Sequence, residues 1–252
     1  MPFPFFFEME LKMNGLNPNC LDDFLFSSSV EKQKLEYILS KKMPFPFGGK
    51  NGILLHGTWG TGKSTLAELL PELLETTHSG TWDMSQGVGQ MPARSRDEVI
   101  TDIFRCGGGL SITAIANSVY GSTSKSAMWH NSNHHYFMFD EVDKLTSGAQ
   151  QSLKAVMGVK RCMFFFTTNY LHKVDVGIQN RCHLVEMNQV TNLASYVPLG
   201  QAILKVMGLL PTAISSQNIE AMAGKAKGSM RDFMDSVVFA AIGEGGVMPD
   251  NS

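Results

Sequence analysis

Apolar residues along this sequence fall into short continuous blocks and into repeats at helical spacing. The clearest blocks are 53–55, 136–139 and 162–166, with a weaker one at 184–187 that Glu186 interrupts. A block that is apolar at every position is typical of a strand covered on both faces, as in a parallel sheet. A helical repeat follows each of the first two blocks. The alternation predicts an open α/β sheet with right-handed crossovers, in which ligands bind at the carboxyl ends of the strands.

The pattern before the first block and between the first two blocks is less regular. Helical spacing at 30–39 predicts a helix before the first strand, and 81–84 has the composition of a short strand. Ser95 and Glu98 have the spacing of a capping box, which predicts a helix that runs to about Phe104. A further helix is expected at 110–120.

The strand signal stops at about residue 188. Helical spacing then recurs in three stretches with no strand pattern between them, which predicts a small all-helical domain after the sheet. The predicted organisation is an arm at 1–20, an α/β domain at 21–187, a helical domain at 188–243 and a flexible tail at 244–252.

Composition narrows the classes of function. The 252 residues carry a formal net charge of -2, so contact with DNA would need a local basic patch. Lys144, Lys154, Lys160 and Arg161 are candidates for such a patch, and a solvated face is the alternative. The four cysteines are scattered, which disfavours a zinc site.

The apolar start of the chain does not have the pattern of a targeting segment. Prolines interrupt Met1–Phe7, Glu8 follows it, and no basic region precedes it, unlike a signal peptide or a membrane span. We expect a soluble, cytoplasmic protein, and an arm that packs on a hydrophobic surface, with a neighbouring subunit as one candidate.

The most specific motif follows the first apolar block. It matches G-x-x-x-x-G-K-[ST], and a strand pattern precedes it while a helical pattern follows it, as a phosphate-binding loop requires. Backbone N–H groups of such a loop and the start of its helix bind a triphosphate. We expect Lys63 to contact the β- and γ-phosphates and Ser64 to ligate Mg²⁺. The predicted ATP-binding residues are Gly57, Thr58, Trp59, Gly60, Thr61, Gly62, Lys63, Ser64 and Thr65.

Polar residues that follow the later blocks complete the predicted site. Asp140 and Glu141 come directly after the second block, where Asp140 would hold Mg²⁺ and Glu141 would polarise the attacking water. The alternative is a solvated pair at the start of a turn. Asn169 ends the expected strand that contains the third block, and it would hydrogen-bond the γ-phosphate or the water, unless it only turns the chain.

Two arginines are candidates for contact with the γ-phosphate. Arg181 precedes the last strand and would act in trans, as an arginine finger in the site of a neighbouring subunit. Arg231 begins the last predicted helix and would contact the phosphates from the helical domain. A surface arginine and a salt bridge at a helix start are the respective alternatives.

The ordered set of motifs resembles AAA+ ATPases. Within that class it is most similar to the clamp-loader clade, meaning the small subunits of replication factor C and the ATPase subunits of phage clamp loaders. The closer similarity is in 140–153 (Asp-Glu-Val-Asp-Lys-Leu-Thr, then Ala-Gln-Gln-Ser-Leu), 168–182 (Thr-Asn-Tyr, then Ile-Gln-Asn-Arg-Cys) and 228–231 (Gly-Ser-Met-Arg). The resemblance implies a ring that binds ATP at subunit interfaces, engages primer–template DNA and loads a sliding clamp.

The sequence departs from that family at three places. Asn180-Arg181-Cys182 stands where the family has Ser-Arg-Cys, which keeps the arginine. The stretch 84–135 matches poorly and is expected to be an insertion or a partner surface. The chain ends after the helical lid, so we expect no collar domain. The compact arrangement also suggests a viral or mobile-element origin, in a bacterial or phage-infected cell.

Three functions remain open at this point. The first is an oligomeric ATPase subunit of a clamp-loader-like ring in DNA replication, with other AAA+ subunits, DNA and a clamp as partners and with ATP and Mg²⁺ as cofactors. The second is an initiator, helicase loader or transposition regulator that assembles on DNA with ATP. The third is a scaffold subunit that does not hydrolyse ATP, which the presence of Lys63 and Glu141 disfavours.

Overall fold

The computed structural model describes residues 18–77, 81–83, 88–90, 99–108, 112–123, 130 and 132–247. The capping box at Ser95 and Glu98, most of the N-terminal arm and the last five residues of the tail lie outside these ranges. The chain divides into two compact units, one formed by Ser28–Asn188 and the other by Gln189–Ser252 together with Met1–Ser27. Each unit is described separately.

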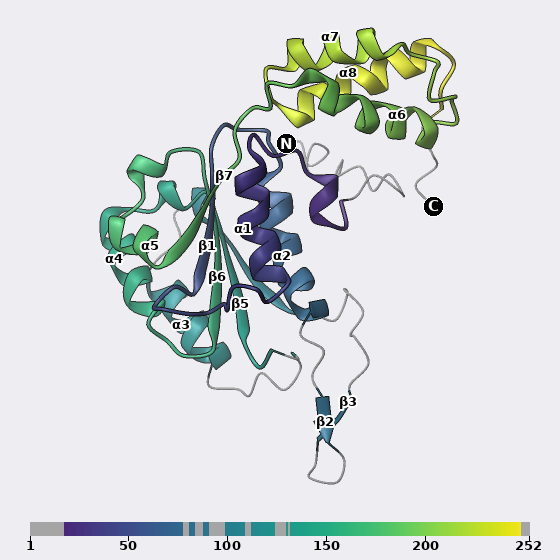
Figure 1. Cartoon of the computed structure of the whole chain (residues 1–252). Helices are drawn as coiled ribbons and strands as arrows, with labels where there is room; N and C mark the ends of the chain where they lie inside the picture. Colours follow the sequence, from purple (N-terminus) through teal and green to yellow (C-terminus); the bar gives the residue numbers. More distant parts are fainter. Residues whose placement is uncertain are drawn as a thin grey trace, which may run out of the picture. The chain divides into compact units, whose positions relative to one another are not determined.

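A five-stranded sheet forms the centre of the first unit (Figure 1). Its strands lie in the order β4-β5-β6-β1-β7, and every neighbouring pair is parallel. The carboxyl ends of all the strands therefore lie along one edge of the sheet, as the sequence pattern predicts. The strands are β1 (Gly52–His56), β4 (Thr101–Arg105), β5 (His135–Asp140), β6 (Cys162–Thr168) and β7 (Cys182–Glu186).

Helices cover both faces of the sheet. In Figure 1, α1 and α2 lie on one face, and α3, α4 and α5 lie on the other. Two short strands that follow α2 and precede β4 in the sequence form a separate antiparallel pair. The helices are α1 (Ser29–Leu39), α2 (Lys63–Thr77), α3 (Ile112–Thr123), α4 (Ser147–Val156) and α5 (Val176–Asn180), with 3₁₀ turns η3 (Cys106–Gly108), η4 (Val142–Lys144) and η5 (Leu171–Lys173), and the separate pair is β2 (Thr81–Asp83) and β3 (Val88–Gln90).

Phenylalanine rings pack between the sheet and α3 and α4. Successive side chains of a strand point to opposite faces, so alternate residues of β5 and β6 reach the same layer. The Phe137 and Phe164 rings stack at 5.5 Å between centroids, and Phe139 stacks on Phe166 at the same distance. All four rings are fully buried. This rigid aromatic layer fixes the central strands whose ends carry the site.

The predicted helix up to Phe104 is wrong, because residues 101–105 form the edge strand β4. Thr101 pairs with Tyr136 and Arg105 pairs with Asp140 in a parallel ladder. Phe104 stacks on Phe139 with ring centroids 4.7 Å apart. Pairing with β5 and this ring contact therefore outweigh the local helix signal, which is a weak determinant of structure.

The second unit is helical. It contains η1 (Leu21–Asp23), η6 (Leu193–Tyr196), α6 (Val197–Val206), α7 (Ser216–Ala226) and α8 (Met230–Gly243). Ser215 and Ser229 cap α7 and α8 by accepting hydrogen bonds from backbone N–H groups. Tyr196 packs edge-on against Phe233 at 5.0 Å in the apolar core of the unit.

Candidate nucleotide site

The loop between β1 and α2 has the backbone curvature of an anion-binding loop. Gly57, Gly60 and Gly62 have φ angles of 135°, 77° and 86°, which favour glycine. Gly57 is constrained further, because a Cβ atom there would lie 2.5 Å from the Met187 carbonyl oxygen. The Met187 N–H donates to His56 at 2.7 Å, which ties the loop to the end of β7.

Lys63 lies inside the curve of this loop. Its ammonium donates to the carbonyl oxygens of Gly57 at 3.1 Å and Thr58 at 2.5 Å. The side chain is only 6% exposed. Burial lowers the pKa of Lys63 to about 8, although the nearby Asp140 carboxylate acts in the opposite direction. The cation is thus held where the phosphates of a bound nucleotide would lie.

Asp140, at the end of β5, contacts hydroxyl groups from two other elements. Ser64, in the first turn of α2, donates to Asp140 Oδ1 at 2.7 Å. Thr167 of β6 donates to the same oxygen at 2.5 Å. The structure therefore brings the two predicted metal ligands, Ser64 and Asp140, into direct contact.

This pair fits the requirements of Mg²⁺. The ion prefers oxygen ligands, and it is usually held by one or two protein groups together with substrate phosphates and water. Among the described residues, no group of three or more His, Cys, Asp or Glu side chains could hold a metal. Ser64 and Asp140 would therefore hold Mg²⁺ only with a nucleotide, and the ion would neutralise charge on its phosphates.

Glu141 has a strained backbone and an ion-pair partner. Its φ and ψ are 55° and 51°, the left-handed region that non-glycine residues rarely adopt. The Glu141 N–H donates to Thr167 Oγ1 at 2.9 Å, which supports that conformation. The Lys144 ammonium donates to Glu141 Oε2 at 2.5 Å. The carboxylate is half-buried at the same sheet edge as the loop.

Asn169 follows β6 and lies at the same edge of the sheet. It is half-buried, and the residues on either side of it are fixed, because Thr168 donates to Asp143 at 2.6 Å and accepts from the Tyr170 N–H at 3.0 Å. Since β6 lies between β1 and β5, Asn169 emerges between the phosphate loop and Asp140.

Arg181 lies at the opposite edge of the sheet. Its carbonyl oxygen accepts from the N–H groups of Asn51 and Gly52, at the start of β1, and its guanidinium donates to Gly177 at 2.8 Å. The phosphate loop follows the other end of β1, and a five-residue strand is about 17 Å long. Arg181 is thus remote from the loop of its own chain, as a residue that acts in trans requires.

Arg231 belongs to the helical unit. It is exposed in the first turn of α8, two residues after the capping Ser229. Gly228 precedes the cap with a φ of 86°, and a Cβ atom there would lie 2.6 Å from Gln189. The close approach explains why this motif has a glycine, while the phosphate contact of Arg231 stays a prediction.

Three polar side chains contact the residues of the site and were not predicted from the sequence. Thr167 joins Asp140 to the Glu141 backbone, Lys144 pairs with Glu141, and Asn188 accepts from the Thr58 N–H at 3.1 Å. A polar residue at the end of a buried strand was the available signal for Thr167. Asn188 is separated from the loop by most of the α/β unit, so its role depends on the tertiary structure.

The fold and this edge of the sheet define a P-loop ATPase with AAA+ architecture. The matched family model is described as "KAP family P-loop domain" and covers residues 31–161, just over half of the chain. The chain belongs to this family. The matched region runs from within α1 to the residue before β6 and includes the phosphate loop, Asp140 and Glu141.

Curated relatives have low identity to the chain. Replication factor C subunit 4 of Saccharomyces cerevisiae is 24% identical over 142 residues, which cover 56% of this chain and 43% of that protein. Replication factor C small subunit of Natronomonas pharaonis is 22% identical over 235 residues, which cover 92% of this chain and 63% of that protein. The chain thus spans less than two thirds of the length of either relative.

Solved structures support the fold. The RuvB Holliday junction branch migration motor of Thermotoga maritima matches with a TM-score of 0.59 and 15% identity, over 88% of this chain and 64% of that one. A point variant of the same protein matches with a TM-score of 0.62 and 14% identity, over 92% and 70%. No helix in the described part of the chain is long and apolar enough to cross a membrane.

Proposed function

We propose that the protein is an ATP-hydrolysing subunit of a clamp-loader-like ring that acts in DNA replication. ATP with Mg²⁺ binds at the loop between β1 and α2, at an interface between subunits. Binding and hydrolysis there are coupled to engagement of DNA and a sliding clamp. The similarity to replication factor C subunits supports this choice among P-loop ATPases.

The observation that carries the proposal is the placement of Arg181. The phosphate loop, Asp140 and Glu141 share the carboxyl edge of the sheet, while Arg181 lies at the amino edge. Head-to-tail association pairs different surfaces of neighbouring subunits, and in our proposal the amino edge of one subunit faces the carboxyl edge of the next. Arg181 then completes the neighbouring site, and hydrolysis depends on assembly.

Each residue has a distinct role in this reaction. The loop N–H groups and Lys63 bind the phosphates, and Ser64 with Asp140 positions Mg²⁺. Glu141 accepts a proton from the attacking water. Asn169 and Arg231 contact the γ-phosphate, and the arginine of the neighbouring subunit stabilises the charge that develops on it.

The direct test compares the ATPase rate per subunit across a dilution series for wild type and Arg181→Ala. We expect the wild-type rate to fall on dilution, and the variant to lose about 10³-fold or more in kcat, because an arginine finger contributes that much. MgATP affinity should change little in the variant. A rate per subunit that is independent of concentration and of the substitution would refute the assignment.

A second function is an initiator, helicase loader or transposition regulator that assembles on DNA. One observation favours it: the matched solved structures reported above are of a branch migration motor. Clamp-dependent stimulation of ATP hydrolysis on primed DNA supports the first function. Growth of ATP-dependent filaments on duplex DNA without a clamp supports the second.

A further inference from the structure

The sequence contains one pentapeptide twice. Met-Pro-Phe-Pro-Phe occurs at 1–5 and again at 43–47. The first copy continues into Phe6, Phe7 and Glu8, with Glu10 shortly after, whereas the second continues into two glycines and a lysine. The nucleotide site uses neither copy. Because the second copy is described in the structure, it shows which surface this pentapeptide fits.

The second copy forms the strap between α1 and β1. The Met43 N–H donates to the Tyr37 carbonyl at 2.9 Å, which turns the strap back from the end of α1. The Phe45 ring lies edge-on to His183 of β7 at 5.8 Å. Phe47, in contrast, is 67% exposed. The strap is therefore fixed by its first half and leaves surface open beside it.

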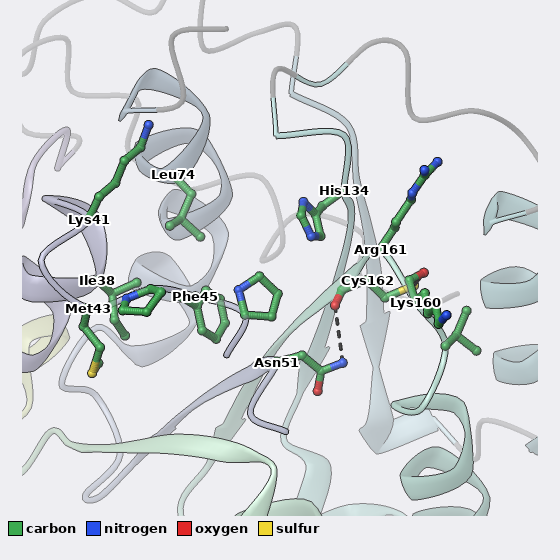
Figure 2. Close-up of a pocket in the computed structure, with 13 residues that line it drawn as sticks. Ile38, Lys41, Met43, Phe45, Asn51, Leu74, His134, Lys160, Arg161 and Cys162 are labelled. Carbon is green, nitrogen blue, oxygen red and sulfur yellow. Dashed lines mark hydrogen bonds between the residues drawn. The ribbon is translucent and has the colours of Figure 1, made fainter. Parts of the chain in front are cut away.

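A cavity of about 560 Å³ lies along this strap, at the amino edge of the sheet (Figure 2). Its volume is in the range of pockets that enclose a drug-sized ligand. Figure 2 shows Lys41 and Arg161 extending from opposite walls, with Leu74 and His134 between them. The lining residues are Ile38, Met43, Pro44, Phe45, Pro46, Leu74 and Val159, which are apolar, and Lys41, Asn51, His134, Lys160, Arg161 and Cys162.

The lysine and arginine side chains that line this cavity are all positively charged. Lys41, Lys160 and Arg161 are all exposed, and no acidic residue is among the described residues that line the cavity. An apolar floor with a cationic rim fits a segment that has apolar anchors next to carboxylates. Residues 1–10 have this composition, with four phenylalanines and the carboxylates Glu8 and Glu10.

We propose that the cavity receives the segment 1–10 of a second copy of the chain. Phenylalanine rings of the segment pack against the strap and Leu74, and Glu8 and Glu10 face Lys41, Lys160 and Arg161. The donor is a second copy because the cavity lies at the edge that carries Arg181, whose carbonyl oxygen accepts from the Asn51 N–H at 3.1 Å. In this respect the inference rests on the proposed function, which makes that edge a contact face between subunits.

The proposed contact also explains why the segment repeats the strap sequence. Met43–Phe47 already packs along this surface, and an identical pentapeptide has the same side chains and the same proline-limited backbone with which to lie beside it. The rings supply the buried apolar area. The charges at the rim are exposed, so they set register and salt dependence more than affinity.

The test uses the full-length protein with a photo-crosslinking benzoyl-phenylalanine in place of Phe6. Mixing isotopically heavy and light protein before irradiation distinguishes crosslinks between copies from those within one chain. We expect crosslinks between copies to peptides that contain residues 38–46 or 159–162. Arg161→Glu with Lys160→Glu should reduce their yield about tenfold or more, because like charges would then face each other.

Controls separate this contact from general association. The same label in place of Phe239, which is 74% exposed in the helical unit, should not crosslink to the cavity. Lys225→Glu, another exposed charge reversal, should leave the yield unchanged. Binding of MgATP by each variant verifies that it is folded.

Three results would overturn the inference: crosslinks within one chain only, crosslinks to other surfaces, or a yield that the Arg161 and Lys160 reversals do not change. These results leave the proposed function intact if hydrolysis still depends on Arg181. Conversely, crosslinks between copies together with hydrolysis that is independent of Arg181 would retain the contact and remove the finger assignment.

Discussion

Lys63 combines a buried position with a required positive charge. Its ammonium is enclosed by the loop carbonyls, and burial lowers its pKa to about 8. The unfolded chain keeps the ordinary, higher pKa, so between about pH 8 and 10 the unfolded state binds more protons. Stability of the fold therefore rises with pH through this window, whereas the capacity of Lys63 to bind phosphate falls.

Affinity for MgATP should consequently decrease above pH 8. A bound triphosphate favours the protonated ammonium, so we expect Kd to rise about eightfold between pH 7.5 and 9 in wild type, given a free-state pKa near 8. Lys63→Arg keeps its charge across this range, and its Kd should be nearly flat with pH. Equilibrium titration with a fluorescent ATP analogue measures both. If Kd rose equally with pH in the two proteins, the pH effect would not come from Lys63.

The ion pair between Glu141 and Lys144 should restrain hydrolysis. The Lys144 ammonium donates to Glu141 Oε2 at 2.5 Å, so this carboxylate oxygen is occupied and is not available to accept from the attacking water. We expect Lys144→Met to raise kcat about two- to tenfold with KM unchanged, and Lys144→Arg to stay close to wild type. Lys154→Met, on α4 beside Asp175, is the matched control. A fall in kcat for Lys144→Met, like that expected of Glu141→Gln, would show that Lys144 instead assists the reaction.

At the scale of elements, the aromatic layer behind β5 and β6 fixes the strand ends that carry Asp140 and Asn169. Phe164 stacks on Phe137 and is completely buried, so truncation leaves a cavity in a close-packed layer. We expect Phe164→Ala to lower the free energy of unfolding by about 3–5 kcal/mol in chemical denaturation. Phe47→Ala removes a ring that is 67% exposed, and it should change the free energy of unfolding by less than about 0.5 kcal/mol. Equal losses for the two variants would contradict the packing described here.

The sequence predicts elements well where one periodicity dominates. The blocks at 136–139 and 162–166 are apolar at every position, and both are central strands of the parallel sheet. Residues 101–105 carry a mixed pattern, and only pairing with β5 makes them a strand. Local signals are thus sufficient for the central strands and for the edge strand β7, where the block at 184–187 predicts it, and insufficient for the other edge strand, β4.

The residues of the site can be divided in the same way, into those that the sequence predicts and those that only the tertiary structure brings there. Gly60, Lys63 and Ser64 lie within five consecutive residues and have a recognisable spacing, so their proximity to one another follows from the sequence. Asn188 and Thr167 reach the site only through the order of strands, which no local pattern specifies. The distance of Arg181 from its own loop likewise follows from the parallel register of β1 and β7.

At the scale of the whole molecule, the two edges of the sheet have complementary character. The carboxyl edge carries Asp140, Glu141 and Asp143, which attract Mg²⁺, and the amino edge carries Arg161 and Arg181. Lys63 and Lys144 also lie at the carboxyl edge, but the three carboxylates there and the two arginines at the amino edge are complementary in the proposed head-to-tail association, in which one subunit would complete the site of the next. Both the proposed arginine contact and the proposed docking of residues 1–10 use this polarity.

Mixing two inactive variants tests the shared site most directly. Arg181→Ala keeps a complete phosphate loop and lacks the finger, while Glu141→Gln keeps the finger and lacks the base. We predict that each alone has almost no ATPase activity and that an equal mixture recovers about a quarter of the wild-type rate, the share of interfaces at which random head-to-tail assembly pairs an intact site with an intact finger. A mixture as inactive as its components, or full activity of Arg181→Ala by itself, would contradict the account.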